Sequence, residues 1–198
     1  MLSNNKYHEQ NNTKLLQLIE TSPLATLVWQ QQNQLASTYL PLIYCKKRQV
    51  LIGHAAKKSP IYQALASGET LNAIFNGPDC YISPTDSPLQ KVPTWHYAKV
   101  HATGIAKLID EPSEARTLLA YCSDFFEQQN NTQWQISTLP EVALCAMLNE
   151  IAIFEIQQVT LTGQFKVSQH KSDQLKTQLI ASLNSRNQST SAALIEIA

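Results

Sequence analysis

The chain has 198 residues, of which 43% are hydrophobic and 15% are charged, and its 15 Lys and Arg balance its 15 Asp and Glu. This composition fits one compact globular domain rather than a disordered chain. A net charge of zero gives no basic face of the kind that contacts nucleic acid, so direct nucleic-acid binding is not expected.

The cysteines and the first residues indicate the compartment. Cys45, Cys80, Cys122 and Cys145 show neither a C-x-x-C pair nor the spacing of a disulfide scaffold, so we expect reduced thiols. The first dozen residues lack the apolar core of a signal peptide, and no apolar run reaches the ~20 residues that span a bilayer. We therefore expect a cytoplasmic protein without a membrane segment.

The first part of the chain predicts a helix followed by a β-meander. Residues 1–12 are rich in Asn and Gln and are expected to be disordered. Apolar spacing then predicts a short amphipathic helix that Thr13 caps and Ser22-Pro23 ends. Runs of apolar and β-branched residues between polar turns predict three antiparallel strands. These strands are expected at Leu24–Trp29, Leu35–Tyr44 and Gln49–His54.

The middle of the chain predicts a helix, two short strands and a loop. Ser59-Pro60 is a typical helix start, because Ser can cap and Pro suits the first helical position, and Gly68 provides a stop after Ser67. Strands are expected at Thr70–Phe75 and Cys80–Ser83. The stretch Pro84–Pro93 has three prolines and no apolar period, which indicates a loop.

The remaining elements begin with a long strand, Trp95–Ile109, which we expect to bend at Gly104. Pro112 then opens a helix whose apolar residues follow helical spacing and are therefore interpreted as core. These core positions are Ala115, Leu118, Leu119, Cys122, Phe125 and Phe126. A helix at Pro140–Leu148, a strand at Glu150–Leu161 and a helix from a Ser168 cap through Leu183 complete the expected elements.

About six or seven strands, mostly joined by short polar turns, favour an antiparallel barrel over a doubly wound sheet. The predicted class is therefore α+β and mainly β, with peripheral helices. The expected division of the chain is a disordered N-terminus at 1–12, one domain at 13–184 and a flexible tail at 185–198.

The sequence shows few catalytic signatures. Its five glycines form neither a phosphate-binding loop nor a nucleophile elbow. His96 and His101 are an odd number of residues apart, so in a strand they face opposite sides, and no metal site is expected. No spacing supports a catalytic Cys–His pair above background.

Two segments are dense in residues that bind ligands. Lys57, Lys58 and Ser59 stand where a strand ends and a helix begins, which suits a phosphate group, although an ordinary solvated turn explains them as well. Lys91–His101 carries aromatic rings and imidazoles from a Pro-rich loop into a strand. Such a mixture can line a planar heteroaromatic ligand, or its aromatics can simply fill the core.

Several sequence blocks occur in the order found in one known family, from about Ser22 to Leu183. They are Thr38-Tyr39-Leu40-Pro41-Leu42, Gly53-His54, Phe75-Asn76-Gly77-Pro78 with Tyr81-Ile82-Ser83, Val92-Pro93-Thr94-Trp95, Val100-His101 with Gly104, and Lys166-Val167-Ser168-Gln169. The chain thereby resembles the PaiB-like family, described as FMN-binding negative transcriptional regulators. The Gly-Pro, Tyr-Ile-Ser and Pro-Thr-Trp blocks are the most specific.

The resemblance implies an FMN-binding split β-barrel related to pyridoxamine-phosphate-oxidase-like flavoproteins, in a homodimer with FMN near the subunit interface. It implies a phosphate site at Lys57, Lys58 and Ser59, and a ring site at Trp95 and His96. The cofactor-binding residues expected from it are Thr38, Leu40, His54, Lys57, Lys58, Ser59, Lys91, Thr94, Trp95 and His96.

The chain departs from the family pattern at several of these positions. The family has His at Tyr39 and Asn at Ser59, His96 and His170, and its Arg-containing phosphate loop becomes Lys57-Lys58. Lysine still neutralises phosphate as a point charge but lacks the bidentate geometry of arginine. The leading hypothesis is a regulatory flavoprotein. The alternatives are a flavin-dependent oxidoreductase and a non-flavin dimeric interaction module on the same barrel.

Overall fold

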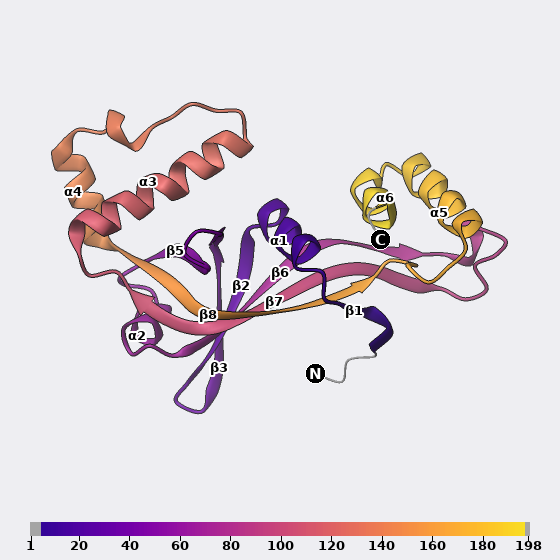
Figure 1. Ribbon diagram of the computed structural model, residues 1–198, viewed down its shortest axis with the longest axis horizontal. Helices are drawn as coiled ribbons and strands as arrows, with labels where there is room; N and C mark the ends of the chain where they lie inside the picture. The colour runs from indigo at the N-terminus through magenta and orange to yellow at the C-terminus, as the bar shows by residue number, and fades with distance from the viewer. Residues whose placement is uncertain (1–4, 197–198) are drawn as a thin grey trace. The chain divides into compact units, whose positions relative to one another are not determined.

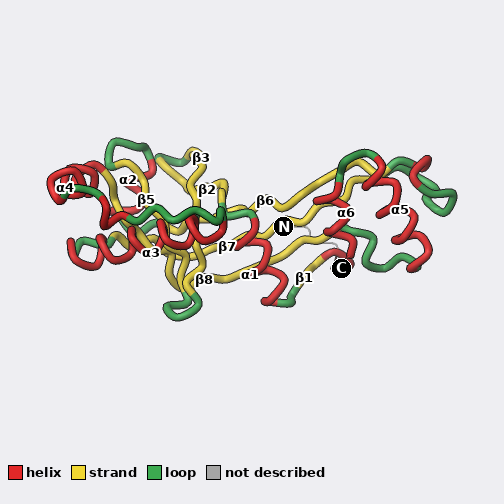
Figure 2. The backbone as a smooth tube through the Cα atoms, turned by 90° about the horizontal axis from the view of Figure 1, so that it is seen from above, coloured by secondary structure: helices red, strands yellow, loops and turns green. Residues whose placement is uncertain are grey.

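The computed structural model describes residues 5–196, which separate into two compact units (Figure 1). Of these residues, unit 1 comprises 5–21, 76–100 and 162–196, and unit 2 comprises 22–75 and 101–161. Neither unit is a continuous stretch of chain, because three strands contribute residues to both. These strands are β6 (Thr70–Ile82), β7 (Thr94–Leu108) and β8 (Ile151–Lys166), coloured yellow in Figure 2.

The strands form an eight-stranded sheet with the order β3-β2-β6-β7-β8-β5-β4, and β1 pairs with β8. The pairs β1–β8, β2–β3, β2–β6, β4–β5 and β5–β8 are antiparallel. The remaining strands are β1 (His8–Glu9), β2 (Leu24–Gln31), β3 (Gln34–Pro41), β4 (Ile43–Cys45) and β5 (Val50–Ala56). Antiparallel pairing with helices between groups of strands confirms the predicted α+β class.

Unit 2 is built on a hydrophobic core between helix α3 and the sheet. Leu118, Leu119 and Cys122 of α3 pack with Ile52 of β5 and Ile153 of β8. The predicted apolar stripe is thus core, as its helical spacing indicated. The helical elements of this unit are α2 (Ile61–Ala66), α3 (Pro112–Gln129), η3 (Ile136–Thr138) and α4 (Glu141–Glu150).

Unit 1 has a second core, in which the C-terminal helices cover one end of β6. Leu175, Leu179 and Ile195 pack with Cys80 and Ile82. Its helical elements are η1 (Asn5–Tyr7), α1 (Asn12–Thr21), η2 (Pro84–Asp86), α5 (Asp173–Ser185) and α6 (Ser189–Glu196).

The two ends of the described chain differ from the expectation of disorder. His8 and Glu9 pair with Gln164 and Gly163 of β8, so backbone hydrogen bonds order a polar segment that has no apolar pattern. In the expected tail, Ala192 and Ile195 are each 2% exposed. Residues 1–4 and 197–198 lie outside the described part, and the division at 13–184 remains a prediction.

Strand β6 is a further difference, because two strands were expected where one forms. Asn76-Gly77-Pro78 has the composition of a turn. In the structure the β2–β6 pairing covers Asn72–Phe75, so Pro78, which lacks an N–H, lies beyond that ladder. A continuous strand therefore tolerates the proline.

Three predicted helix caps are replaced by neighbouring residues. Asn11 Oδ1, rather than Thr13, accepts the first backbone hydrogen bond of α1, from Thr13 N–H at 2.9 Å. Ser172, rather than Ser168, caps α5 through its side chain. Ser59 does not cap α2, which has Pro60 at its N-cap and no side-chain cap bond. Sequence spacing identified the helices but not their exact first residues. For α5, the expected cap Ser168 lies four residues before the actual cap, Ser172.

Between residues 5 and 196 no helix combines the length and hydropathy that crossing a membrane requires. Within the same range no three His, Cys, Asp or Glu side chains are grouped so as to hold a metal ion.

Candidate functional site

Six of the predicted cofactor-binding residues belong to unit 2, where they come from β3, β5 and the turn after β5. Thr38 and Leu40 are half-buried on one face of β3, whereas Tyr39 between them is 68% exposed on the other. His54 lies on β5, opposite Ile153 of β8. Lys57, Lys58 and Ser59 follow the end of β5 directly.

Gly53 allows the end of β3 to approach β5. A Cβ at this position would lie 2.5 Å from Leu42 Cδ2, closer than real Cβ contacts, and 3.2 Å from the Pro41 carbonyl oxygen, which is tighter than most of them. The absence of a side chain therefore lets the junction of β3 and β4 pack on β5. The strand with Thr38 and Leu40 is in this way held against the strand that ends in the lysines.

His54 is a neutral group at neutral pH. Its side chain is half-buried, and burial lowers its pKa because the charged imidazolium loses solvation. A neutral imidazole can donate one hydrogen bond and accept another, which suits the polar edge of a heteroaromatic ring.

The two lysines differ in their surroundings. Lys58 Nζ lies 3.1 Å from Glu150 Oε2. The backbone N–H of Lys57 donates to the Glu150 carbonyl oxygen at 2.9 Å, but its ammonium group has no ion-pair partner among residues 5–196. Ser59 Oγ donates to the Ala56 carbonyl oxygen at 2.6 Å. Among the three residues of the predicted phosphate site, Lys57 is therefore the one whose charged group is available to bind a phosphate.

Lys57 also lines a cavity of about 230 Å³. Its other polar lining residues are Tyr62, Asp110 and Asn149, and its apolar floor includes Ile151. Sequence analysis did not predict Asp110 or Asn149 as site residues, because they come from distant segments that carry no motif. The volume is below the ~300 Å³ of typical ligand pockets, so the cavity can accept only part of a flavin nucleotide.

The other four predicted residues belong to unit 1. Lys91 is an exposed loop residue, and Thr94, Trp95 and His96 begin β7. Trp95 is 54% exposed and makes an edge contact with Tyr81, with ring centroids 6.2 Å apart. His96 is 2% exposed. Alternation along the strand thus places the Trp95 and His96 side chains on opposite faces of β7.

His96 is held by a polar contact inside unit 1. Its Nε2 lies 2.8 Å from Ser168 Oγ, and its Nδ1 has no hydrogen-bond partner within the described chain. Burial, together with the nearby Lys166 ammonium, lowers the pKa of His96 to about 4. The ring is therefore neutral at neutral pH and has one nitrogen left unpaired.

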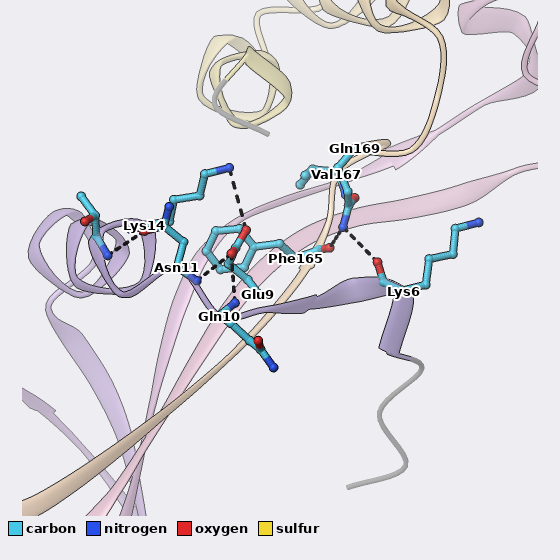
Figure 3. A network of polar contacts seen from close by, with 9 residues as sticks. Lys6, Glu9, Gln10, Asn11, Lys14, Phe165, Val167 and Gln169 are labelled. Atoms are coloured by element: carbon cyan, nitrogen blue, oxygen red, sulfur yellow. Dashed lines mark hydrogen bonds and ion pairs between the residues drawn. The ribbon is translucent and has the colours of Figure 1, made fainter.

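His96 and Thr94 line a second cavity, of about 180 Å³, with residues from the end of β8. Gln169 holds the segment that follows β8. Its Oε1 accepts from Val167 N–H at 3.0 Å, and its Nε2 donates to the carbonyl oxygens of Phe165 and Lys6 (Figure 3). The family block Lys166-Val167-Ser168-Gln169 was not expected to belong to a site.

The residues of unit 2 fit a flavin nucleotide chemically. They offer a phosphate an unpaired ammonium at Lys57, and they offer a ring system the neutral imidazole of His54. Which of the ten predicted residues contact the cofactor remains a prediction.

Comparison with solved structures shows the class of fold. The flavocytochrome Anf3 of Azotobacter vinelandii matches with a TM-score of 0.63 at 10% identity, over 83% of this chain and 72% of that one. An FAD and heme binding protein of Mycobacterium smegmatis matches with a TM-score of 0.61 at 15% identity, over 81% and 73%. The fold is the antiparallel split β-barrel of flavin-binding proteins, as predicted.

Sequence comparison gives the family. Residues 1–161 match the family described as "Putative FMN-binding domain", and the chain belongs to it. The protease synthase and sporulation protein PAI 2 of Bacillus subtilis is 26% identical over 171 residues, which cover 85% of this chain and 82% of the relative. Protein AN0679 of Emericella nidulans is 26% identical over 198 residues, with 78% and 79% covered. The resemblance to the PaiB-like family is confirmed, and with it a flavin cofactor, FMN.

Proposed function

We propose that this flavoprotein is regulatory, and that its FMN-bound form takes part in the negative control of gene expression. The observation that carries the proposal is the similarity to PAI 2, a protein named for protease synthesis and sporulation, over 85% of the chain. The PaiB-like blocks from Thr38 to Gln169 support the same role.

In this proposal the turn after β5 binds the phosphate end of FMN. The phosphate is bound by the Lys57 ammonium, which has no carboxylate partner in the described chain, while Lys58 adds charge from its pair with Glu150. Thr38 and Leu40 of β3 and His54 of β5 supply polar and apolar contacts to the remainder of the nucleotide. Bound FMN supplies reversible one- and two-electron redox chemistry.

Trp95 is proposed separately as a stacking residue of unit 1. A half-exposed indole next to the Tyr81 ring offers a flat apolar surface that a heteroaromatic ring can cover. Because His96 faces the opposite side of β7, it does not share this surface.

The charge of the chain suggests how regulation is exerted. The 15 basic and 15 acidic residues cancel, so the chain as a whole has no excess of positive charge to favour counterion release on DNA. We therefore propose that the FMN-bound protein acts through another protein rather than by direct contact with a promoter.

The test compares flavin binding with gene expression. The purified protein is titrated with FMN and followed by its visible spectrum, and transcripts are profiled in cells that carry the wild type, a gene deletion or Lys57→Ala. Transcripts that rise in the deletion and stay raised in the Lys57→Ala strain support regulation through the cofactor. Wild-type expression in a Lys57→Ala strain whose protein no longer binds FMN would contradict it.

The oxidoreductase alternative gives a different result in the same preparation. Rapid bleaching of the bound flavin by NADH or NADPH, followed by multiple turnovers with an acceptor, would replace the regulatory proposal. Direct DNA contact is tested by a gel shift at two salt concentrations, and a strongly salt-dependent shift would contradict the proposed protein partner.

A further inference from the structure

We propose that the 180 Å³ cavity of unit 1 is a binding site for a small phosphate-type oxyanion, held by Lys166, Lys171, Ser168 and His96. The proposal does not rest on the regulatory function or on flavin binding. None of the residues that line the cavity belongs to the expected phosphate turn at Lys57, and of those proposed to hold the anion only His96 belongs to the expected cofactor-binding set.

The lining of the cavity is positively charged and, within the described chain, contains no carboxylate. Lys166 is half-buried and lies 5.6 Å from the centroid of the Tyr7 ring, and Lys171 is exposed at the rim. Neither ammonium group forms an ion pair with a described residue. Two uncompensated cations around one small cavity favour an anion, whose charge they neutralise at short range.

The neutral groups of the cavity also offer hydrogen bonds. His96 Nδ1 is buried and has no partner in residues 5–196, and an unpaired buried polar atom costs about 1–3 kcal/mol. When Ser168 Oγ donates to His96 Nε2, the proton of the neutral ring resides on Nδ1, which then becomes a donor. A bound oxyanion is the ligand that accepts such a bond.

The His170 imidazole at the exposed rim is engaged by the protein itself. His170 Nε2 lies 2.6 Å from the Lys6 carbonyl oxygen. Because a carbonyl oxygen only accepts, Nε2 carries the proton of this contact, and the orientation of the His170 ring is fixed at the cavity mouth.

The turn that carries Ser168 and Lys171 is held in a defined conformation. Ser168 has a positive φ of 61°, a conformation that costs a non-glycine residue roughly 1–3 kcal/mol. The Gln169 side-chain bonds to Phe165 and Val167 hold the turn in place (Figure 3). Lys171 N–H donates to the Ser168 carbonyl oxygen at 2.9 Å. This arrangement keeps Ser168 beside His96 and brings Lys171 to the rim.

The size of the cavity selects the ligand. At about 180 Å³ it is below the ~300 Å³ of sites for drug-sized molecules, so it suits a ligand smaller than a flavin nucleotide. A tetrahedral oxyanion with one or two waters fits. The anion is either a free ion or the phosphate group of a larger molecule whose remainder stays outside.

The experiment titrates the full chain, purified in phosphate-free buffer, with inorganic phosphate. Binding is followed by calorimetry and by the ¹⁵N signals of the His96 imidazole, which report a ligand at Nδ1. For the double variant Lys166→Gln/Lys171→Gln we expect binding weakened by at least about tenfold, the loss that removing a charge-assisted hydrogen bond gives. Lys176→Gln, on α5 outside the cavity, is the matched control and should bind like the wild type.

The site is overturned by a wild-type protein that binds no phosphate, or by binding that the double variant leaves unchanged. Lys171→Gln alone, at an exposed position, keeps the test valid if the double variant unfolds, and each variant is checked by thermal unfolding without ligand. An unperturbed His96 signal at saturating phosphate also contradicts the site.

Competition distinguishes the two sources of the anion. If FMN displaces inorganic phosphate and riboflavin does not, the site takes the phosphate of the nucleotide. If neither displaces it, the site takes a free oxyanion. A protein that binds phosphate but no flavin would refute the flavin contacts proposed above and leave this site intact.

Discussion

Arg48 Nε lies 2.6 Å from Glu155 Oε1, and the Glu155 side chain is 1% exposed. The contact is an ion pair rather than an aligned hydrogen bond, since within the described chain Glu155 Oε1 has no hydrogen-bond partner. Gln157 Nε2 donates to the other carboxylate oxygen at 2.9 Å. Arg48 also reaches Glu114 Oε1 on α3 at 2.8 Å, so one guanidinium joins the β4–β5 turn to β8 and to α3.

Replacement of Arg48 should therefore destabilise unit 2 strongly. Arg48→Ala leaves the buried Glu155 carboxylate without its cation, and breaking a buried pair costs roughly 3–5 kcal/mol. Glu114→Ala removes only the exposed partner and should cost about 1 kcal/mol or less. Urea unfolding of both variants measures the difference, and equal losses would show that the buried pair contributes no more than the exposed one.

The two lysines after β5 should differ in FMN binding. Lys57→Ala removes the ammonium that has no carboxylate partner in the described chain, and we expect roughly 10- to 100-fold weaker binding. Lys58→Ala removes a cation already paired with Glu150 and should weaken binding less than about fivefold. Fluorescence titration of flavin gives both constants, and the reverse order would assign the phosphate to Lys58.

Stability should fall as the protein is acidified, partly because of His96. Its pKa is about 4 in the folded protein, depressed first by burial and then by Lys166, against an ordinary value of 6.5. Its contribution is therefore fully present above pH 6.5 and is lost as the pH falls towards 4, by roughly 3 kcal/mol in total. Burial lowers the pKa of His54 and His101 as well, with the same sign.

His96→Asn isolates that contribution, because asparagine does not titrate. Unfolding free energies measured from pH 7 to pH 4 in phosphate-free buffer should decline less steeply for the variant than for the wild type. Identical slopes would mean that His96 is already accessible to protons in the folded state.

Gly104 should not tolerate a side chain. A Cβ at this position would overlap the Gln157 carbonyl oxygen and Ile156 Cγ2, and backbone cannot move aside as a side-chain end can. We expect Gly104→Ala to cost roughly 1–3 kcal/mol or more. Gly68→Ala meets nothing closer than 3.6 Å and should cost only the ~1 kcal/mol of its positive φ. Thermal unfolding of the pair separates steric overlap from conformational strain.

Local sequence pattern predicts the helices and their buried faces but not the pairing between distant strands. The α3 stripe was predicted because helical periodicity is a property of neighbouring residues, and Leu118 and Cys122 are indeed core. The continuity of β6 through Pro78 was missed because it depends on tertiary pairing. A proline is tolerated where the neighbouring strand does not need a backbone N–H at that position. The pairing of His8 and Glu9 was missed for a related reason, since their partners on β8 are more than 150 residues away.

The candidate sites show the same division. Lys57 and His96 were singled out from sequence, but their pairing states were not, because Glu150 and Ser168 come from distant segments. Ser168 was expected to cap a helix, a role that its left-handed backbone excludes and that Ser172 fills. Residue identity predicted which groups bear chemistry, whereas tertiary contacts decide which of them are free to bind.

The interleaving of the two units along the chain has a consequence for biosynthesis. Unit 2 is complete once the residues up to Leu161 have cleared the ribosome, so its core can close without residues 162–196. Unit 1 needs residues 162–196, including the β8 partner of β1 and the helices that cover Cys80 and Ile82. Until residues 162–196 emerge, the parts of β6 and β7 that belong to unit 1 lack the helices that cover them. During that interval they are the part of the nascent chain most in need of a chaperone.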